Sequence, residues 1–261
     1  MTEAVKVVRD GAVLEVTLDR PKANAIDAAT SRRMGEVFKA FRDDPDLRVA
    51  IVTGGGEKFF SAGWDLKKAA AEDEPPDADY GVGGFAGIQQ LPDLNKPVIA
   101  ALNGMAVGGG FELALSCDLI LAAEHVRFAL PEINVGVLAD AATIKLPRRI
   151  PHNVAMDILL TGRWMDAAEA KHWGLLNEIV PADRLLPRAR EIATLLAEGP
   201  PMVFAAIKEV IRRSEGMPEQ VALDLVTRRG FPTVDRLYDS EDIKEGPRAF
   251  AEKRKPVWKG R

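Results

Sequence analysis

Asn103-Gly-Met-Ala-Val-Gly-Gly-Gly-Phe-Glu-Leu-Ala114 is the stretch that decides the architecture, because a run of glycines in it opens directly into an apolar helix. Glycine turns let consecutive backbone N–H groups point outward together, and a helix N-terminus adds positive potential at the same place. Groups arranged in this way hold an oxyanion. Glu112 falls in the first turn of the helix, so the stretch predicts an oxyanion-binding turn with a carboxylate beside it.

Strands are expected on both sides of this helix, which the pattern places at Gly110–Cys117. Val98–Leu102 and Leu119–Ala122 are short aliphatic runs of the kind that form buried strands. Farther upstream, Val5–Val8 and Val13–Leu18 flank a turn and predict a hairpin. Strands that alternate with helices in this way indicate an α/β domain.

Helices are also predicted elsewhere in the chain, and they dominate beyond about residue 150. Asp27 is a suitable N-cap for the first of them. The apolar residues of these helices recur at spacings of three and four, so each helix needs another surface to cover one face. The predicted ranges are Ala28–Phe41, Leu185–Ala197, Pro201–Arg213 and Pro218–Arg229.

A second carboxylate, Glu132, follows a short predicted strand and a proline, twenty residues after Glu112. Taken alone, Glu112 would be an ordinary first-turn helix glutamate and Glu132 a solvated loop residue. Two carboxylates beside an oxyanion-binding turn can instead act as general acid and general base. The combination therefore predicts a catalytic pair.

Four motifs in order resemble the crotonase family, the enoyl-CoA hydratases and isomerases, over nearly the whole chain. The motifs are Leu18–Ile26, Phe60–Leu66, Gly108–Ala114 and Pro131-Glu132. The resemblance implies an α/β fold made of a crotonase-like spiral of β-β-α units with a C-terminal helical region. It implies that residues 1–198 form the core with the acyl-CoA site. Residues 199–261 would then form an oligomerisation region, in a homotrimer or a dimer of trimers.

The same resemblance implies a hydro-lyase that reversibly hydrates an α,β-unsaturated acyl-CoA thioester. Glu112 and Glu132 would be the catalytic residues, and the backbone N–H groups of Ala62 and Gly109 would form the oxyanion hole. Coenzyme A is part of the substrate, so the resemblance implies no further cofactor and no metal.

Substrate contacts are also implied by position in the family motifs. Coenzyme A contacts are expected from Lys22, Ala23, Ala25, Asp65 and Leu66, with Phe250 and Lys253 reaching it from a neighbouring subunit. The acyl pocket is expected to include Trp64, Tyr80 and Phe85. The acidic segment 69–84 is interpreted either as a lid over the site or as a solvated insertion.

Three narrower stretches resemble the branch of this family whose substrates are crotonobetainyl-CoA and L-carnitinyl-CoA. They are Arg20–Asp27, Gly56–Lys67 and Phe250–Arg261. These substrates carry a trimethylammonium group, and an aromatic face attracts a quaternary cation. The aromatic residues of the expected acyl pocket fit that interpretation, although aromatic residues also serve simply as packing.

Asp140 leaves a second mechanism open, because it lies eight residues after Glu132, where dienoyl-CoA isomerases of the family place an aspartate. An isomerase would use Glu132 and Asp140. Those isomerases usually carry an aspartate at the position of Glu112, so Glu112 favours hydration. A third hypothesis is a non-catalytic crotonase-like protein that binds acyl-CoA or RNA, which the intact glutamate pair disfavours.

Composition excludes several other classes of protein. The chain has 261 residues, of which 47% are hydrophobic and 28% charged, as in globular domains. A net charge of −4 argues against nucleic-acid binding, and the single cysteine, Cys117, rules out an intramolecular disulfide. No apolar run approaches the roughly 20 residues of a membrane span, and Met1–Lys6 has no apolar signal region. A cytoplasmic location is therefore expected.

Overall fold

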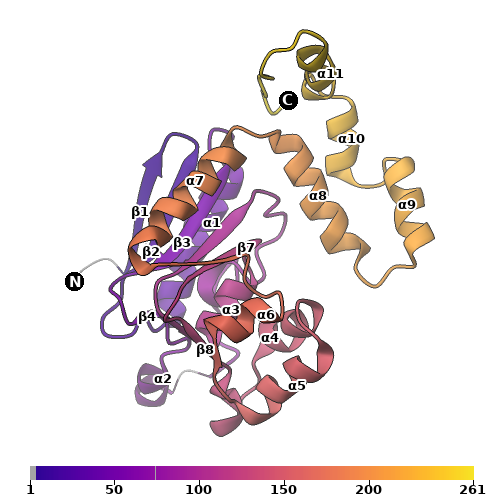
Figure 1. Cartoon of the computed structure of the whole chain (residues 1–261). Helices are drawn as coiled ribbons and strands as arrows, with labels where there is room; N and C mark the ends of the chain where they lie inside the picture. The colour runs from indigo at the N-terminus through magenta and orange to yellow at the C-terminus, as the bar shows by residue number, and fades with distance from the viewer. Residues whose placement is uncertain (1–3, 74) are drawn as a thin grey trace.

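One spiral of chain winds between a large sheet and a small sheet, and this winding forms the core (Figure 1). The structure is a computed structural model that describes residues 4–73 and 75–261. Residues 1–3 lie outside the described residues, and so does Glu74 of the acidic segment. The prediction that Met1–Lys6 has no apolar signal region concerns residues 1–3 in part.

The large sheet has the strand order β1-β2-β3-β5-β7-β10. Its strands are β1 (Val5–Asp10), β2 (Val13–Leu18), β3 (Val49–Gly54), β5 (Val98–Leu102), β7 (Leu119–Ala123) and β10 (Glu178–Val180). β1 and β2 pair antiparallel as the predicted hairpin, and the later neighbours pair parallel. Every residue of β3 and β5 is buried, which explains why these strands appear in the sequence as continuous aliphatic runs.

The small sheet has the order β4-β6-β8-β9. Its strands are β4 (Phe59–Ser61), β6 (Met105–Val107), β8 (Arg127–Ala129) and β9 (Met165–Asp166). β6 pairs parallel with both β4 and β8, whereas β9 pairs antiparallel with β8. The chain passes from β3 to β4, from β5 to β6 and from β7 to β8, so each such pair of consecutive strands is divided between the two sheets. With helical segments between the turns, this is the predicted spiral of β-β-α units, and the fold class is confirmed.

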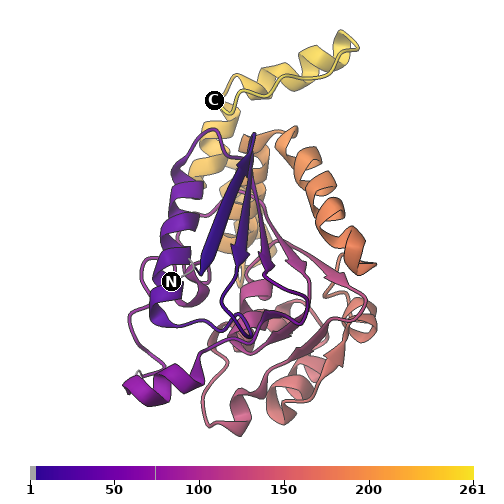
Figure 2. The ribbon, with the colours of Figure 1, turned by 90° about the vertical axis from the view of Figure 1, so that its left-hand side faces the viewer.

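Helices α1 (Ala28–Asp43) and α7 (Leu185–Ala197) lie on opposite faces of the large sheet (Figure 2). Asp27 caps α1 as predicted, because its side chain accepts a hydrogen bond from Thr30 N at 2.8 Å. One stripe of α1 is buried in the core, which anchors the helix. This stripe includes Met34, Val37, Phe38 and Phe41.

The remaining helical segments of the spiral are short and lie mostly after the strands of the small sheet. They are α2 (Leu66–Glu72), η1 (Phe85–Gly87), α3 (Gly109–Leu115), η2 (Pro131–Asn134), α4 (Asp140–Lys145), η3 (Leu146–Arg148), α5 (His152–Thr161), α6 (Ala167–His172) and η4 (Ala182–Arg184). Within residues 4–73 and 75–261, no helix has the length and apolar character needed to cross a membrane. The cytoplasmic location stays a prediction.

The C-terminal helices leave the spiral and extend away from it (Figure 1). They are α8 (Pro201–Ser214), α9 (Glu219–Thr227), α10 (Pro232–Tyr238) and α11 (Asp242–Ala251). Ala206, Phe231 and Val234 form a small apolar cluster here, separate from the cluster of the spiral, which ends in α7. The predicted boundary after residue 198 falls between the two clusters, and a role of the C-terminal region in oligomerisation stays a prediction.

Candidate active site

Three parallel strands of the small sheet end at one edge, and the segments that follow them carry the candidate site. β4 leads into Gly63 and Trp64, β6 leads into Gly108 and the start of α3, and β8 leads into Glu132. Ligands of parallel sheets bind at the carboxyl ends of the strands. Backbone pairing therefore brings together motifs that lie far apart in the sequence.

The loops after β4 and β6 touch each other through glycine. Gly63 has φ +78°, and a Cβ atom built on it would lie 2.6 Å from Gly109 N and 2.7 Å from Val107 O. Real Cβ atoms essentially never approach other atoms so closely. Only glycine fits both the backbone conformation and the space, so this contact fixes the distance between the two loops.

The N–H group of Ala62 is not available to a substrate, because it donates a hydrogen bond to Ala23 O at 2.9 Å. The expectation that Ala62 contributes to the oxyanion hole is therefore corrected. Two residues later, the N–H of Trp64 meets no acceptor among the described residues, and neither does the N–H of Gly109 at the start of α3. The bonds from Ile26 N to Gly63 O, at 2.7 Å, and from Asp65 N to Ile26 O, at 2.9 Å, hold the backbone on both sides of Trp64.

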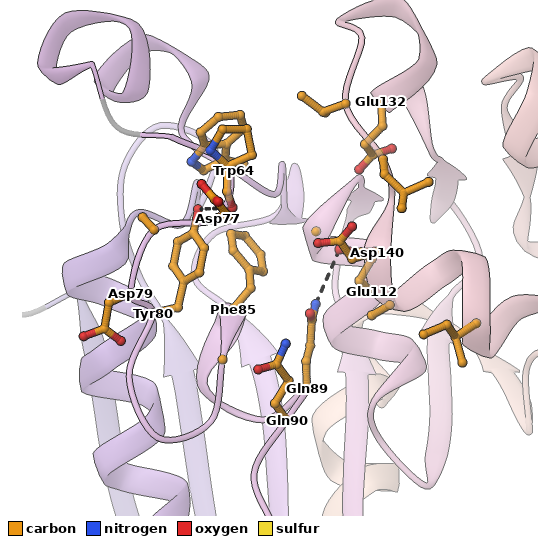
Figure 3. A pocket seen from close by; sticks show the side chains of 18 of the residues that line it. Trp64, Asp77, Asp79, Tyr80, Phe85, Gln89, Gln90, Glu112, Glu132 and Asp140 are labelled. Atoms are coloured by element: carbon orange, nitrogen blue, oxygen red, sulfur yellow. Dashed lines mark hydrogen bonds between the residues drawn. The ribbon is translucent and has the colours of Figure 1, made fainter.

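Glu112 is buried on α3 and held by hydrogen bonds to both of its carboxylate oxygens. Oε1 accepts a bond from Ala142 N of α4 at 2.9 Å, and Oε2 accepts one from Gln89 Nε2 at 3.4 Å (Figure 3). Burial raises the pKa of Glu112, and these two bonds counteract part of that effect because they stabilise the carboxylate.

Glu132 lies in η2, and its carboxylate reaches over the glycine turn. A Cβ atom on Gly108 would lie 2.6 Å from Glu132 Oε1, while Oε2 is buried without a hydrogen-bond partner in the described structure. Burial, together with the nearby charge of Glu112, raises the pKa of Glu132 to about 7. Glu132 can therefore hold a proton near neutral pH, whereas the bonds to Glu112 favour its anion.

A cavity of about 500 Å³ joins the two glutamates to the expected acyl pocket. In Figure 3, Glu112, Glu132 and Asp140 lie on one side, and the aromatic residues lie on the other. The predicted residues that line the cavity are Trp64, Tyr80, Phe85, Gly109, Glu112, Glu132 and Asp140. The structure thus gathers these residues around one space large enough for an acyl group.

A sequence profile described as enoyl-CoA hydratase/isomerase matches residues 9–261 of the chain. The chain belongs to the enoyl-CoA hydratase/isomerase family. Carnitinyl-CoA dehydratase of Citrobacter koseri is 54% identical to it over 262 aligned residues, covering 100% of both chains. Carnitinyl-CoA dehydratase of Salmonella typhi is 53% identical with the same coverage.

Solved structures of enoyl-CoA hydratases agree with this relationship. The enzyme from Mycobacterium tuberculosis H37Rv superposes with a TM-score of 0.89 at 36% identity, covering 99% of both chains. The enzyme from Bacillus anthracis gives a TM-score of 0.90 at 33% identity, covering 99% of this chain and 100% of its own. The predicted family is confirmed, and with it an enzyme of the enoyl-CoA hydratase type.

In this enoyl-CoA hydratase/isomerase family member, the residues expected around coenzyme A lie outside the lining of the cavity. Ala23 O accepts the bond from Ala62 N, and Ala25 O accepts one from Arg20 at 2.8 Å. Asp65 caps α2 by accepting a bond from Lys68 N at 3.1 Å. These residues hold the loop that carries Trp64, and their contact with coenzyme A stays a prediction.

The other expected coenzyme A contacts are at the surface or far from the spiral. Leu66 and Lys22 are exposed. Phe250, which is 87% exposed, and Lys253 belong to the C-terminal region that extends away from the spiral (Figure 1). Phe250 and Lys253 would have to reach coenzyme A from another subunit, which stays a prediction.

Gln89 and Asp77 are among the residues that line the cavity and that the sequence did not predict. Gln89 follows η1 in a turn, and its neighbourhood carries no periodic or motif signal. Asp77 belongs to the acidic segment, which was interpreted as a unit rather than residue by residue. Both residues reach the site through tertiary folding, which local sequence patterns do not encode.

Gly63→Ala should destabilise the protein more than Gly56→Ala. Both glycines have a positive φ, +78° and +76°, so alanine costs about 1–2 kcal/mol of backbone strain at each. A Cβ on Gly56 would meet no atom within 4 Å, whereas one on Gly63 would clash with Gly109. We expect about 1–3 kcal/mol of additional loss and loss of turnover for Gly63→Ala only.

Urea denaturation of both variants, together with a turnover assay, measures this difference. Equal losses of unfolding free energy would contradict the view that the loop contact at Gly63 is tightly fitted.

Proposed function

We propose that the chain reversibly hydrates crotonobetainyl-CoA to L-carnitinyl-CoA. The observation that carries the proposal is the convergence of Glu112 and Glu132 on one cavity beside the backbone N–H groups of Trp64 and Gly109, which meet no acceptor among the described residues. The full-length identity of 53–54% to carnitinyl-CoA dehydratases supports the choice of acyl group.

The oxyanion hole would consist of the N–H groups of Trp64 and Gly109. Addition of water to an α,β-unsaturated thioester moves negative charge onto the thioester oxygen. Two donors that are already fixed in place stabilise this enolate without reorganising. The glycine contact at Gly63 and the backbone bonds around Trp64 supply that rigidity.

The two glutamates would divide acid and base between them. Glu112, held as a carboxylate by Ala142 and Gln89, takes a proton from water while the water oxygen bonds to Cβ. Glu132, whose pKa is raised to about 7, delivers its proton to Cα. Hydration leaves the proton on Glu112 and the charge on Glu132, so a proton must pass back from Glu112 to Glu132, directly or through water, before the next turnover. The reverse sequence of steps eliminates water.

Glu112→Gln and Glu132→Gln should each lower the rate of hydration by at least about 10²-fold, the usual scale for general acid–base groups. Binding of the thioester should change little, because the oxyanion donors belong to the backbone. The double variant should lose much less than the product of the two single losses, since both groups act on one water. Steady-state kinetics with an enoyl-CoA substrate measures all three variants.

Asp140→Asn is the matched test for the isomerase alternative, because Asp140 lines the same cavity. If Glu112 and Glu132 carry out hydration, the Asp140→Asn variant should keep most of its turnover. An Asp140→Asn variant without turnover, combined with an active Glu112→Gln variant, would overturn the hydratase mechanism in favour of isomerisation.

Crotonobetainyl-CoA should be a better substrate than crotonyl-CoA. The aromatic side chains of Trp64, Tyr80 and Phe85 line the cavity, and an aromatic face attracts a quaternary cation by about 0.5–2 kcal/mol. This corresponds to a preference of roughly 2- to 30-fold in kcat/KM. Equal kcat/KM values for the two thioesters would contradict the proposed acyl specificity but not the proposed hydratase activity.

We also propose that the enzyme assembles as a homotrimer or a dimer of trimers. Ile211 is 67% exposed and Leu223 is 51% exposed, and both belong to the extended C-terminal helices. Exposed apolar side chains concentrated in one region mark an interaction surface. Light scattering at micromolar concentration should give three or six times the chain mass of 28.4 kDa, and a monomer would refute the assembly.

A further inference from the structure

One wall of the cavity combines aromatic rings with a carboxylate. Tyr80 and Phe85 pack edge to face, with ring centroids 5.3 Å apart and planes inclined by 78°. Tyr80 Oη donates a hydrogen bond to Pro76 O at 3.2 Å, which ties the ring to the backbone next to Asp77. In Figure 3, Trp64, Asp77, Tyr80 and Phe85 stand together across the cavity from Glu132.

The charge of the cavity favours a cationic acyl group. Among the described residues of its lining, Lys145 is the one cation, and its Nζ donates to Ser116 Oγ at 2.6 Å. Burial lowers the pKa of this amine. The carboxylates of the lining outnumber it. They are Asp77, Glu112, Glu132 and Asp140, and Asp79 also lines the cavity with its carboxylate directed away from it.

Asp77 differs from its neighbour Asp79 in what its side chain does. Asp79 Oδ1 accepts a hydrogen bond from Gly81 N at 2.9 Å, and in Figure 3 its carboxylate points away from the cavity. Asp77 is exposed and forms no hydrogen bond or ion pair within the part of the chain that the structure describes, so none of those residues neutralises its charge at the cavity wall.

We propose that Asp77 is a specificity-determining residue that attracts the trimethylammonium group of the acyl chain, with Tyr80 and Phe85 as the aromatic surface beside it. This inference rests on the proposed function. A quaternary ammonium has no N–H to donate, so only charge attraction and ring faces can recognise it. In crotonobetainyl-CoA a single methylene joins Cβ to the nitrogen. The cation therefore stays in the same cavity as the two glutamates.

The test compares binding of two saturated thioesters that cannot be hydrated. One carries the trimethylammonium group, and the other carries a tert-butyl group in which carbon replaces nitrogen. The ratio of their dissociation constants isolates the positive charge from size and shape. In the unmodified enzyme, calorimetry should show tighter binding of the cationic thioester.

Asp77→Asn should reduce this ratio by about 3- to 10-fold by weakening only the cationic thioester, and added salt should reduce the ratio in the unmodified enzyme. Asp79→Asn is the matched control, because it removes the same charge from the same segment and should leave the ratio unchanged. A merely structural role of Asp77 would weaken both thioesters together.

An equal effect of Asp77→Asn on both thioesters, or an unchanged ratio, would overturn the inference. The proposed function fails separately, if the unmodified enzyme does not hydrate crotonobetainyl-CoA in a turnover assay. The binding ratio is measured without turnover, so the two failures are distinguishable.

Discussion

The parallel pairing of β4, β6 and β8 is the constraint on which the site depends. Because these strands end at one edge, the segments that follow them carry Trp64, Gly109 and Glu132 to a common space. Hydrogen bonds of the backbone, rather than side-chain contacts, thus determine where the chemistry takes place. The close approach of Gly63 to Gly109 then sets the spacing of the two N–H groups, and any side chain at Gly63 would separate them.

The two glutamates lie in different environments within one cavity, and that difference is what acid–base chemistry requires. Both carboxyl groups are removed from water, which raises the pKa of each. Ala142 and Gln89 stabilise the charged form of Glu112, whereas Glu132 Oε2 has no partner in the described structure. The proton therefore resides preferentially on Glu132.

The sequence predicted β1, β2, β5 and β7 of the large sheet, together with α1 and α7, because aliphatic runs and regular periodicity determine them. It did not predict β4, β6 or β9, since strands of two or three residues have no measurable period. The oxyanion motif pointed to the loop after β4, but the N–H group expected there, that of Ala62, is engaged within the protein. The deciding fact is the bond from Ala62 to Ala23, between residues far apart in the chain. Gln89 and Asp77 were missed for a related reason, because only tertiary folding brings them to the cavity.

The proposed contacts for the acyl group and the proposed catalytic groups come from different parts of the chain. Asp77, Tyr80 and Phe85 belong to one continuous segment between α2 and β5, whereas the catalytic groups follow the strands of the small sheet. Trp64 is the one residue of the described cavity lining placed in both, through its ring and its N–H. Because Gln89, which bonds to Glu112, follows in the same segment, the acyl pocket could be altered independently of the proposed acid–base pair only by exchanges confined to residues 77–85.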